Sequence, residues 1–272
     1  MTAPPWVPTE VPIDRPSAAR MYDYYLGGFH NFEVDRQMAE EAIRLWPELP
    51  LIMRANRGFL RRAVTYLVNQ GIDQFLDIGS GIPTVGNVHE VAHRGNPDAH
   101  VVYVDIDPIA VAHSRAILHG TPNVGVIQAD LRNPQKILND PVVLDVLDFH
   151  RPMAVFVVAV LHFLPDDAQA YACVRELRDA LAPGSYLVIS HASSEGDPDR
   201  SREHEALYAR TPNPLKTRSL DQIRAFFGDF ELVEPGAVWL PLWHPERDDD
   251  LFLDHPERCT GLAGVGLKPP PP

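Results

Sequence analysis

Three aspartates, each expected where a strand ends, are the residues of this sequence best placed to bind a ligand. Asp77 closes the apolar run of "FLDIGSGIP", just before Gly79 and Gly81, Asp105 follows about 26 residues beyond Gly79, and Asp130 ends "NVGVIQAD". Carboxylates accept hydrogen bonds. Set along one sheet edge, they suit an ammonium group, ribose hydroxyls and an adenine amino group.

The two glycines of "DIGSGIP" allow close approach of backbone to a ligand and angles that other residues avoid. A dinucleotide fingerprint requires a third glycine where Thr84 stands. Asp77 would also repel a diphosphate. An adenosine with a charged amino-acid tail and no phosphate satisfies all three aspartates, and S-adenosylmethionine is such a ligand. The alternatives are a nicotinamide dinucleotide or a purely structural strand and turn.

The elements that must position these residues follow a βαβ rhythm, which predicts a parallel sheet with right-handed crossovers. Five strands are expected, at residues 74–79, 100–107, 123–130, 153–163 and 185–193. Two weaker strand candidates span 230–240 and 261–268. Helical patterns fill 17–71, 84–94, 108–120, 134–147, 166–184 and 198–227. The expected organisation is an extended arm (1–16), a helical cap (17–71), an α/β core (72–268) and a proline tail (269–272).

The motifs "FLDIGSGIP", "VVYVDIDPIAV", "VIQADLR", "AVLHFLPD" and "LAPGSYLVIS", in this order, resemble those of class I S-adenosylmethionine-dependent methyltransferases over roughly residues 70–192. "RMYDYYLGGFHNFEVDR" and "RANRGFLRRAV" resemble a bacterial subfamily whose substrates are largely unassigned. Pro83 departs from the third glycine of many relatives. The resemblance implies a Rossmann-like α/β fold with a mostly parallel seven-stranded sheet, an antiparallel last strand and the N-terminal helical cap.

The resemblance also implies which residues hold S-adenosylmethionine, and its product S-adenosylhomocysteine. The glycine loop would hold the amino-acid portion, Asp105 the ribose, and Asp130 with Leu131 the adenine. The residues expected at the cofactor are Asp77, Gly79, Ser80, Gly81, Asp105, Ile106, Asp130, Leu131 and Ala159. Asp107 is expected instead to cap the helix that Pro108 opens.

Methyl transfer needs alignment and a deprotonated nucleophile. His162, just past the fourth strand in "AVLHFLPD", is the candidate catalytic base, and His191 is a weaker one. His162 could instead simply bond backbone.

"YDYYLGGFHNF" gathers aromatic residues around Gly27-Gly28. Tyr22, Tyr25 and Phe29 fall at helical spacing, which fits either a face packed on the core or a lid over the cofactor. The lid is favoured by the subfamily resemblance. Asn31 and Arg57 are placed on the same lid or substrate side.

His89, Glu90 and His93 spell H-E-x-x-H, the pattern of zinc proteases. Asn96 and Ala99 stand where the extended zinc motif requires Gly and His. No metal is therefore expected, and zinc proteolysis remains a remote alternative.

Composition narrows the function further. A net charge of −13 argues against nucleic acid as the main partner, and no "N/D-P-P-Y/F" signature of amino methylation occurs at the fourth strand. No run approaches the roughly 18 to 20 apolar residues that cross a bilayer, and the first residues do not read as a secretory signal. With two cysteines, the chain is expected to be cytoplasmic. The sequence predicts methylation of a small-molecule acceptor, or alternatively cofactor binding without transfer, and leaves the oligomeric state open.

Overall fold

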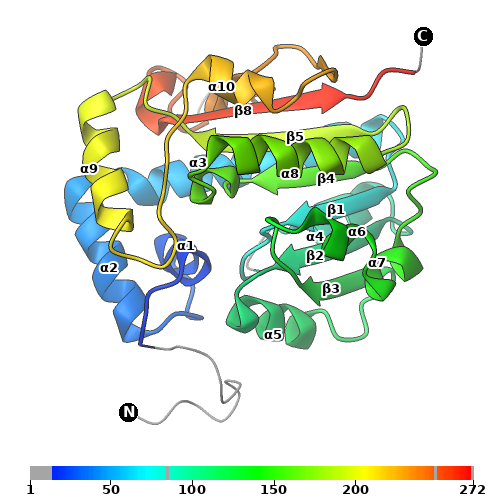
Figure 1. Ribbon diagram of the computed structural model, residues 1–272, viewed down its shortest axis with the longest axis horizontal. Helices are drawn as coiled ribbons and strands as arrows, with labels where there is room; N and C mark the ends of the chain where they lie inside the picture. Colours follow the sequence, from blue (N-terminus) through cyan, green and yellow to red (C-terminus); the bar gives the residue numbers. More distant parts are fainter. Residues whose placement is uncertain (1–13, 84–85, 248–249, 271–272) are drawn as a thin grey trace.

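The computed structural model describes residues 14–83, 86–247 and 250–270 (Figure 1). In this part of the chain, eight strands form one sheet in the order β3-β2-β1-β4-β5-β8-β6, with β7 also paired to β8. The strands are β1 (Gln74–Ile78), β2 (His100–Asp105), β3 (Val124–Gln128), β4 (Ala154–Val158), β5 (Tyr186–Ala192), β6 (Glu231–Leu232), β7 (Val238–Trp239) and β8 (Gly261–Leu267).

The first five strands are parallel and β8 runs antiparallel to β5. This confirms the predicted mostly parallel α/β sheet with an antiparallel last strand. The sheet has eight strands where seven were expected, because two short strands both pair with β8. β6 pairs with the end of β8 at Leu267, and β7 pairs with its start at Leu262. Pro235 and Gly236 separate them, and proline cannot donate to a ladder.

Helices cover both faces of the sheet (Figure 1). They are α1 (Ala18–Tyr25), α2 (Glu33–Leu45), α3 (Leu49–Asn69), α4 (Val88–Gly95), α5 (Pro108–Ile117), α6 (Pro134–Leu138), α7 (Pro141–Val146), α8 (Asp167–Ala180), α9 (Pro198–Tyr208) and α10 (Leu220–Ala225), with short 3-10 turns η1 (Leu161–Phe163), η2 (Leu240–Leu242) and η3 (Pro256–Cys259).

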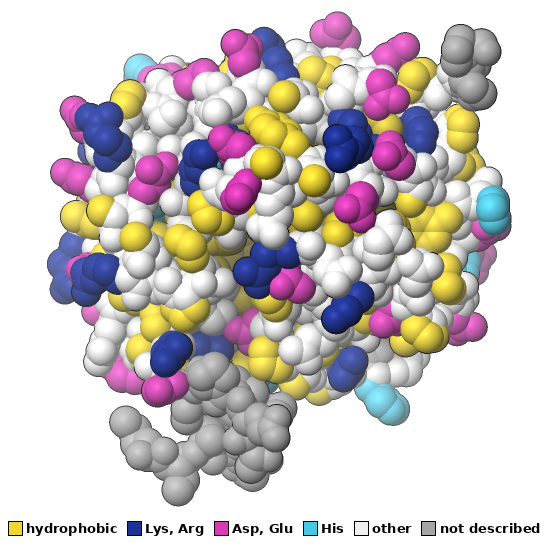
Figure 2. All heavy atoms as spheres, in the orientation of Figure 1, with side chains coloured by type: hydrophobic (Ala, Val, Ile, Leu, Met, Phe, Trp, Pro, Cys, Tyr) yellow, Lys and Arg dark blue, Asp and Glu magenta, His cyan; other side chains and the backbone are white. Residues whose placement is uncertain are grey.

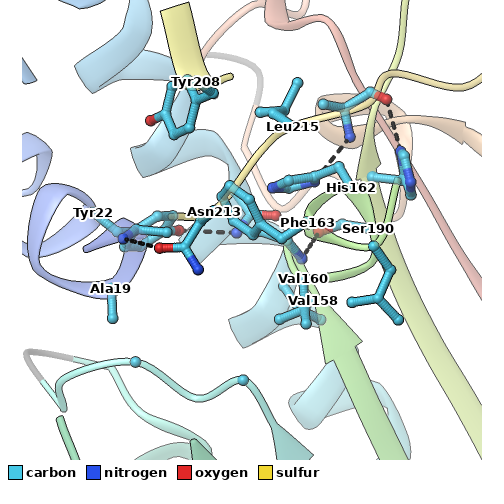
Figure 3. A pocket seen from close by; sticks show the side chains of 18 of the residues that line it. Ala19, Tyr22, Val158, Val160, His162, Phe163, Ser190, Tyr208, Asn213 and Leu215 are labelled. Carbon is cyan, nitrogen blue, oxygen red and sulfur yellow. Dashed lines mark hydrogen bonds between the residues drawn. The ribbon is translucent and has the colours of Figure 1, made fainter. Parts of the chain in front are cut away.

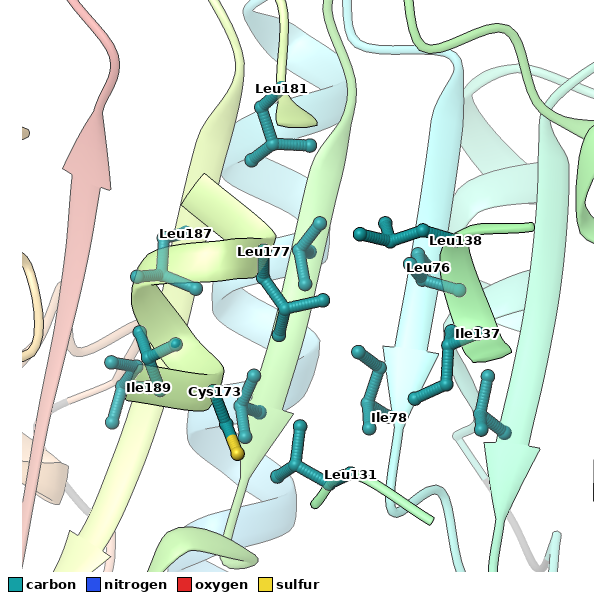
Figure 4. Close-up of a cluster of buried hydrophobic side chains, with 14 of the residues drawn as sticks. Leu76, Ile78, Leu131, Ile137, Leu138, Cys173, Leu177, Leu181, Leu187 and Ile189 are labelled. Carbon is teal, nitrogen blue, oxygen red and sulfur yellow. The ribbon is translucent and has the colours of Figure 1, made fainter. Parts of the chain in front are cut away.

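The two faces of the strands build two separate cores, because successive strand residues point to opposite sides. On one side Leu76 and Ile78 pack with Cys173 and Leu177 of α8 (Figure 4). On the other side Phe75 packs with residues of α3 and α4. Strands buried on both faces explain the nearly continuous apolar runs of the sequence.

A third cluster joins the cap to α9. Met21, Tyr25, Trp46, Leu207 and Tyr208 are all buried within it. Figure 1 shows α1, α2 and α9 gathered at one end of the sheet. The cap therefore includes a helix from the second half of the chain, which its expected range of 17–71 does not contain.

Three predicted helical stretches are broken where glycine or proline falls. Range 17–71 forms three helices, because Gly27 turns the chain at a φ of +81° and Pro47 requires extended backbone before it. The second half of α3 packs on the sheet through Phe59 and Leu67, so α3 belongs to the core as well as to the cap. Pro141 divides 134–147, and an irregular segment, 209–219, divides 198–227.

Among the helices of the described residues, each is too short or too polar to span a bilayer. The predicted arm lies almost wholly outside the described residues, as do Thr84 and the last two residues of the proline tail.

Candidate functional site

The loop after β1 needs glycine at two positions. Gly79 has a φ of +74°, and a Cβ there would lie 2.1 Å from Cγ2 of Val160. Gly81 has a φ of +66°, and its N–H donates to Oδ2 of Asp105 across 2.7 Å. The left-handed backbone therefore brings the loop against the residue that ends β2.

Asp105 is held rigidly by the backbone. Its second carboxylate oxygen, Oδ1, accepts from the N–H of Asp107 at 2.8 Å. Burial raises the pKa of Asp105 to about 6, although the two N–H donors oppose the rise. A carboxylate fixed in this way is preorganised to accept hydrogen bonds from a ligand's hydroxyls.

Asp77 lies at the end of β1, paired in the sheet with Tyr103 and Phe156. Burial raises the pKa of its carboxyl to about 7, and the charge of Arg57 acts in the opposite direction. The guanidinium of Arg57 also donates to Oδ1 of Asn87 across 2.8 Å. A buried carboxylate with a guanidinium beside it complements an ammonium and a carboxylate, the two ends of an amino-acid group.

A cavity of about 540 Å³ opens beyond the ends of the parallel strands. It brings together nearly all the residues that the sequence proposed for the site. Those that line it are Tyr22, Tyr25, Arg57, Asp77, Gly79, Ser80, Gly81, Asp105, Ile106, Asp130, Leu131, Ala159 and His162.

Asn31 is the exception, because it does not line the cavity. Its amide donates to Oδ2 of Asp23 at 2.8 Å and to the carbonyl of Gly28 at 3.0 Å, so it fastens the turn between α1 and α2. The helical spacing that included Phe29 is also wrong, because α1 ends at Tyr25 and Phe29 is 92% exposed. Gly28 faces the Asp23 carboxylate, where a Cβ would clash.

Two further aspartates follow strands β2 and β3. Asp107 caps α5, as predicted, by accepting from the N–H groups of Ile109 and Ala110. Asp130 lines the cavity, but its carboxylate also accepts from Nε of Arg132 at 2.9 and 3.0 Å. These bonds lower its pKa against the effect of partial burial.

His162 lies in the turn after β4 and is 8% exposed. Its Nδ1 accepts from the N–H of Ala192 at 3.4 Å (Figure 3), which assigns the ring proton to Nε2. Burial, with the charge of Arg218 as a second cause, lowers the pKa of His162 to about 3. The ring is therefore neutral at physiological pH.

His191, the weaker candidate, has both ring nitrogens engaged. Nδ1 donates to the carbonyl of Ala192 at 2.7 Å, and Nε2 accepts from Arg218 at 2.8 Å. Arg218 is fully buried and also donates to the carbonyls of Leu161 and Leu164 and to Asp167. It fixes the turn that carries His162, and this role could not be predicted because the partners of Arg218 come from distant segments of the chain.

A line of hydrogen bonds connects the cap with the strand ends. Asn56 donates from Nδ2 to the hydroxyl of Tyr22 at 2.9 Å and accepts from Oγ of Ser190 at 2.6 Å. Ser190 Oγ in turn accepts from the N–H of Ala159 at 3.0 Å. Ala159 has a φ of +58°, and these bonds hold that strained backbone at the cavity wall.

The two histidines of the H-E-x-x-H motif form hydrogen bonds within the fold. Nδ1 of His89 pairs with the hydroxyl of Tyr103 at 2.7 Å, and Nε2 of His93 pairs with the carbonyl of Ala99 at 2.9 Å. Glu90 accepts from the N–H of Gly86 and the amide of Asn87. Within the described ranges, no cluster of three His, Cys, Asp or Glu side chains has a metal-binding arrangement.

The strand order reverses between β1 and β4, and the glycine loop, Asp77 and Asp105 lie at this reversal, where open α/β sheets bind nucleotide-like ligands. Fold and site together define a Rossmann-like, class I methyltransferase type of protein. The chain matches the model of the S-adenosyl methyltransferase family over residues 4–269 and belongs to that family. S-adenosylmethionine is thus its cofactor, and the chain is a member of a methyltransferase enzyme family.

Solved structures agree with the family. A proposed methyltransferase from Thermobifida fusca is 43% identical with a TM-score of 0.92, over 98% of this chain and 100% of the other. A DUF574 family protein from Streptomyces avermitilis is 38% identical with a TM-score of 0.90, over 94% and 99%. The N-methyltransferase NodS from Bradyrhizobium japonicum, in complex with S-adenosylhomocysteine, shares the fold at 14% identity and a TM-score of 0.52, over 92% and 100%. No curated protein matches the chain significantly.

Proposed function

We propose that this chain transfers the methyl group of S-adenosylmethionine to a small-molecule acceptor bound beneath the cap. The observation that carries the proposal is the cavity, which is continuous from the glycine loop to Trp46 and Tyr208 and is roofed by α1, α9 and the segment 209–219. A ligand there is surrounded by protein, as small molecules are in most such pockets.

The residues present fit the cofactor. Val160 packs so closely on Gly79 that a Cβ there would clash, and the loop residues Gly79, Ser80 and Gly81 all line the cavity. Asp77 and Arg57 would hold the ammonium and carboxylate of its amino-acid portion, and Asp105 the ribose hydroxyls. Ile106, which is 47% exposed on the cavity wall, offers an apolar surface to the adenine beside Asp130 and Leu131. When bound, S-adenosylmethionine supplies an electrophilic methyl group on a sulfonium.

His162 is proposed to contact the acceptor. Its neutral ring, with the proton on Nε2, favours donation of a hydrogen bond over uptake of a proton, because a group with a pKa of about 3 holds a proton weakly near pH 7. Tyr22 and Tyr25 would close the cavity from the cap side. Their hydroxyls are anchored to Asn56 and Tyr208, so they act as a fixed wall.

The proposal also retains the exclusion of nucleic acid. On the face seen in Figure 2, basic and acidic side chains are interspersed, and the net charge is −13. A phosphate backbone binds instead to a continuous basic surface. The predicted cytoplasmic location remains a prediction.

Methyl transfer is tested with S-adenosylmethionine labelled in its methyl group. The protein is incubated with a bacterial extract divided into small-molecule, protein and nucleic-acid fractions. Label should enter the small-molecule fraction, and Asp105→Ala should abolish most of it. Label only in macromolecules would contradict the acceptor class. Cofactor binding without any transfer would support the alternative, a binding protein with no transferase activity.

A further inference from the structure

We infer that the inner part of the cavity is an acceptor site for an uncharged aromatic molecule. This inference rests on the proposed function and specifies its substrate class. The site is formed by Trp46, Phe163, His204 and Tyr208, and it ends at His162.

These five side chains form a continuous aromatic wall, although they come from three separate parts of the chain. Ring centroids are 5.5 Å apart for Trp46 and His204, 5.2 Å for His204 and Tyr208, and 6.0 Å for Tyr208 and Phe163. The wall closes with Phe163 and His162 at 4.4 Å. Figure 3 shows Tyr208, Phe163 and His162 at the cavity, with Leu215 near them. Such ring faces and edges favour a flat aromatic partner.

Two polar atoms of this wall do not face the cavity: Nε1 of Trp46 and Nε2 of His204 are buried, with no hydrogen-bond partner among the described residues. Trp46 and His204 nevertheless line the cavity, although they are only 4% and 8% exposed. They therefore offer a bound molecule apolar surface, which favours an aromatic partner.

The side chains of the wall carry no net charge. The guanidinium of Arg200 lies over the Trp46 ring at 5.3 Å, but it pairs with Glu48 and Asp197 and does not line the cavity. Burial lowers the pKa of His204 to about 4 and that of His162 to about 3, so both rings are neutral at physiological pH. Within the described residues, the charged side chains lining the cavity are Arg57, Asp77, Asp105, Asp107, Asp130, Arg132 and Asp166.

Those charged groups belong elsewhere in the cavity. The carboxylates other than Asp166 lie at or just after the ends of β1, β2 and β3, with Arg57 beside Asp77 and Arg132 paired to Asp130. Asp166 caps α8. A charged acceptor would therefore meet no counter-charge on the aromatic wall, and its desolvation would be uncompensated.

The test uses protein saturated with S-adenosylhomocysteine, whose own titration is recorded first. Calorimetry then measures binding of phenols with one, two or three fused rings, each against the aryl carboxylate of the same ring system. We expect at least one phenol to bind, and its carboxylate partner to bind at least ten-fold more weakly. Phe163→Leu, which keeps an apolar side chain but removes the aromatic ring, should weaken the phenol about five- to ten-fold.

Two controls separate the possible failures. Phe163→Leu should leave S-adenosylhomocysteine affinity unchanged, which shows that the variant is folded. Phe29→Leu, at a side chain that is 92% exposed and does not line the cavity, should bind the phenol as the wild type does. The inference is overturned if no phenol binds, if carboxylates bind as well as phenols, or if Phe163→Leu has no effect. Failure of S-adenosylhomocysteine to bind, with phenol binding intact, would instead overturn the proposed function.

Discussion

Arg20 donates from Nη1 to Oδ2 of Asp107 across 3.1 Å, and this bond joins the cap to the loop that carries Asp105. The same guanidinium donates from Nε to Asp35 at 2.8 Å. Ser17 adds a second bond from the cap to Asp107. Because the N–H of Asp107 donates in turn to Asp105, the cap and the proposed ribose carboxylate share one buried network.

Replacing Arg20 should therefore destabilise the protein and weaken cofactor binding together. Arg20→Met leaves Asp35 and Asp107 buried beside an apolar side chain, a change that costs about 3–5 kcal/mol when one partner of a buried ion pair is removed. Urea unfolding measures the loss. Arg202→Met is the matched control, because Arg202 and Asp199 are 70% and 86% exposed and exposed pairs contribute about 0–1 kcal/mol. Equal stability of the two variants would contradict the network's role.

Gly79→Ala should abolish most cofactor binding. The new Cβ meets Val160 as well as the strain of a positive φ. Gly71→Ala is the control for strain alone, since Gly71 has a φ of +84° with nothing within 4 Å. We expect Gly71→Ala to cost about 1–2 kcal/mol of stability and to leave cofactor affinity intact. Gly79→Ala with Val160→Ala should recover part of the binding. Loss of affinity in Gly71→Ala would show that the effect is global.

The contribution of Asp77 to the stability of the ligand-free protein should fall as pH rises from 4 to 7. The pKa of Asp77 is raised from 3.8 to about 7, so the folded state holds this proton more tightly than the unfolded state. Its stabilising contribution is full below pH 4 and is lost as pH rises through 7. Asp77→Asn removes this loss. Between pH 4 and 7, the free energy of unfolding of the variant should therefore rise relative to that of the wild type. We expect a rise of at least about 1.4 kcal/mol, the equivalent of one pKa unit, measured by urea unfolding at each pH.

Cofactor affinity should have the opposite pH dependence. An ammonium group pairs only with ionised Asp77, so the affinity for S-adenosylhomocysteine should rise between pH 6 and 8. In Asp77→Asn the rise should shrink to the part contributed by Asp105, whose pKa is about 6. An unchanged pH profile in the variant would exclude Asp77 from binding the amino group.

His162 should stay neutral between pH 5 and 8, with its proton on Nε2. Nuclear magnetic resonance of protein with labelled histidine reads both the protonation and the tautomer, and His162→Gln assigns the signal. A constant shift is expected because the pKa is lowered to about 3. A titration near pH 6.5, the ordinary histidine value, would restore His162 as a candidate general base.

The sequence predicts the part of the site that depends on neighbours along the chain. Asp77, Gly79 and Asp105 lie at strand ends, and strand ends follow from short apolar runs with a period that can be read locally. Asp107 could be assigned to α5 because capping acts within three residues.

The rest depends on contacts between distant segments. Arg20 binds Asp107, which lies 87 positions further along the chain. The hydrogen-bond partners of the buried Arg218 likewise lie before α8 and at the end of β5. The aromatic wall combines Trp46 with residues of α9. Only the proximity of His204 and Tyr208 could be predicted, because residues at i and i+4 lie on the same face of a helix. Asn31 was misplaced because its neighbours are aromatic, while its own role is to fasten a turn.

The central claim is tested most directly by calorimetric titration of S-adenosylhomocysteine into the wild type, Asp105→Ala and Asp145→Ala. Asp145 is an exposed residue of α7 and serves as the charge-matched control. We predict binding near micromolar for wild type and Asp145→Ala, and at least a ten-fold loss for Asp105→Ala, about 1.4 kcal/mol. Wild-type protein that does not bind, or an Asp105→Ala variant that binds equally well, would contradict the cofactor site described above.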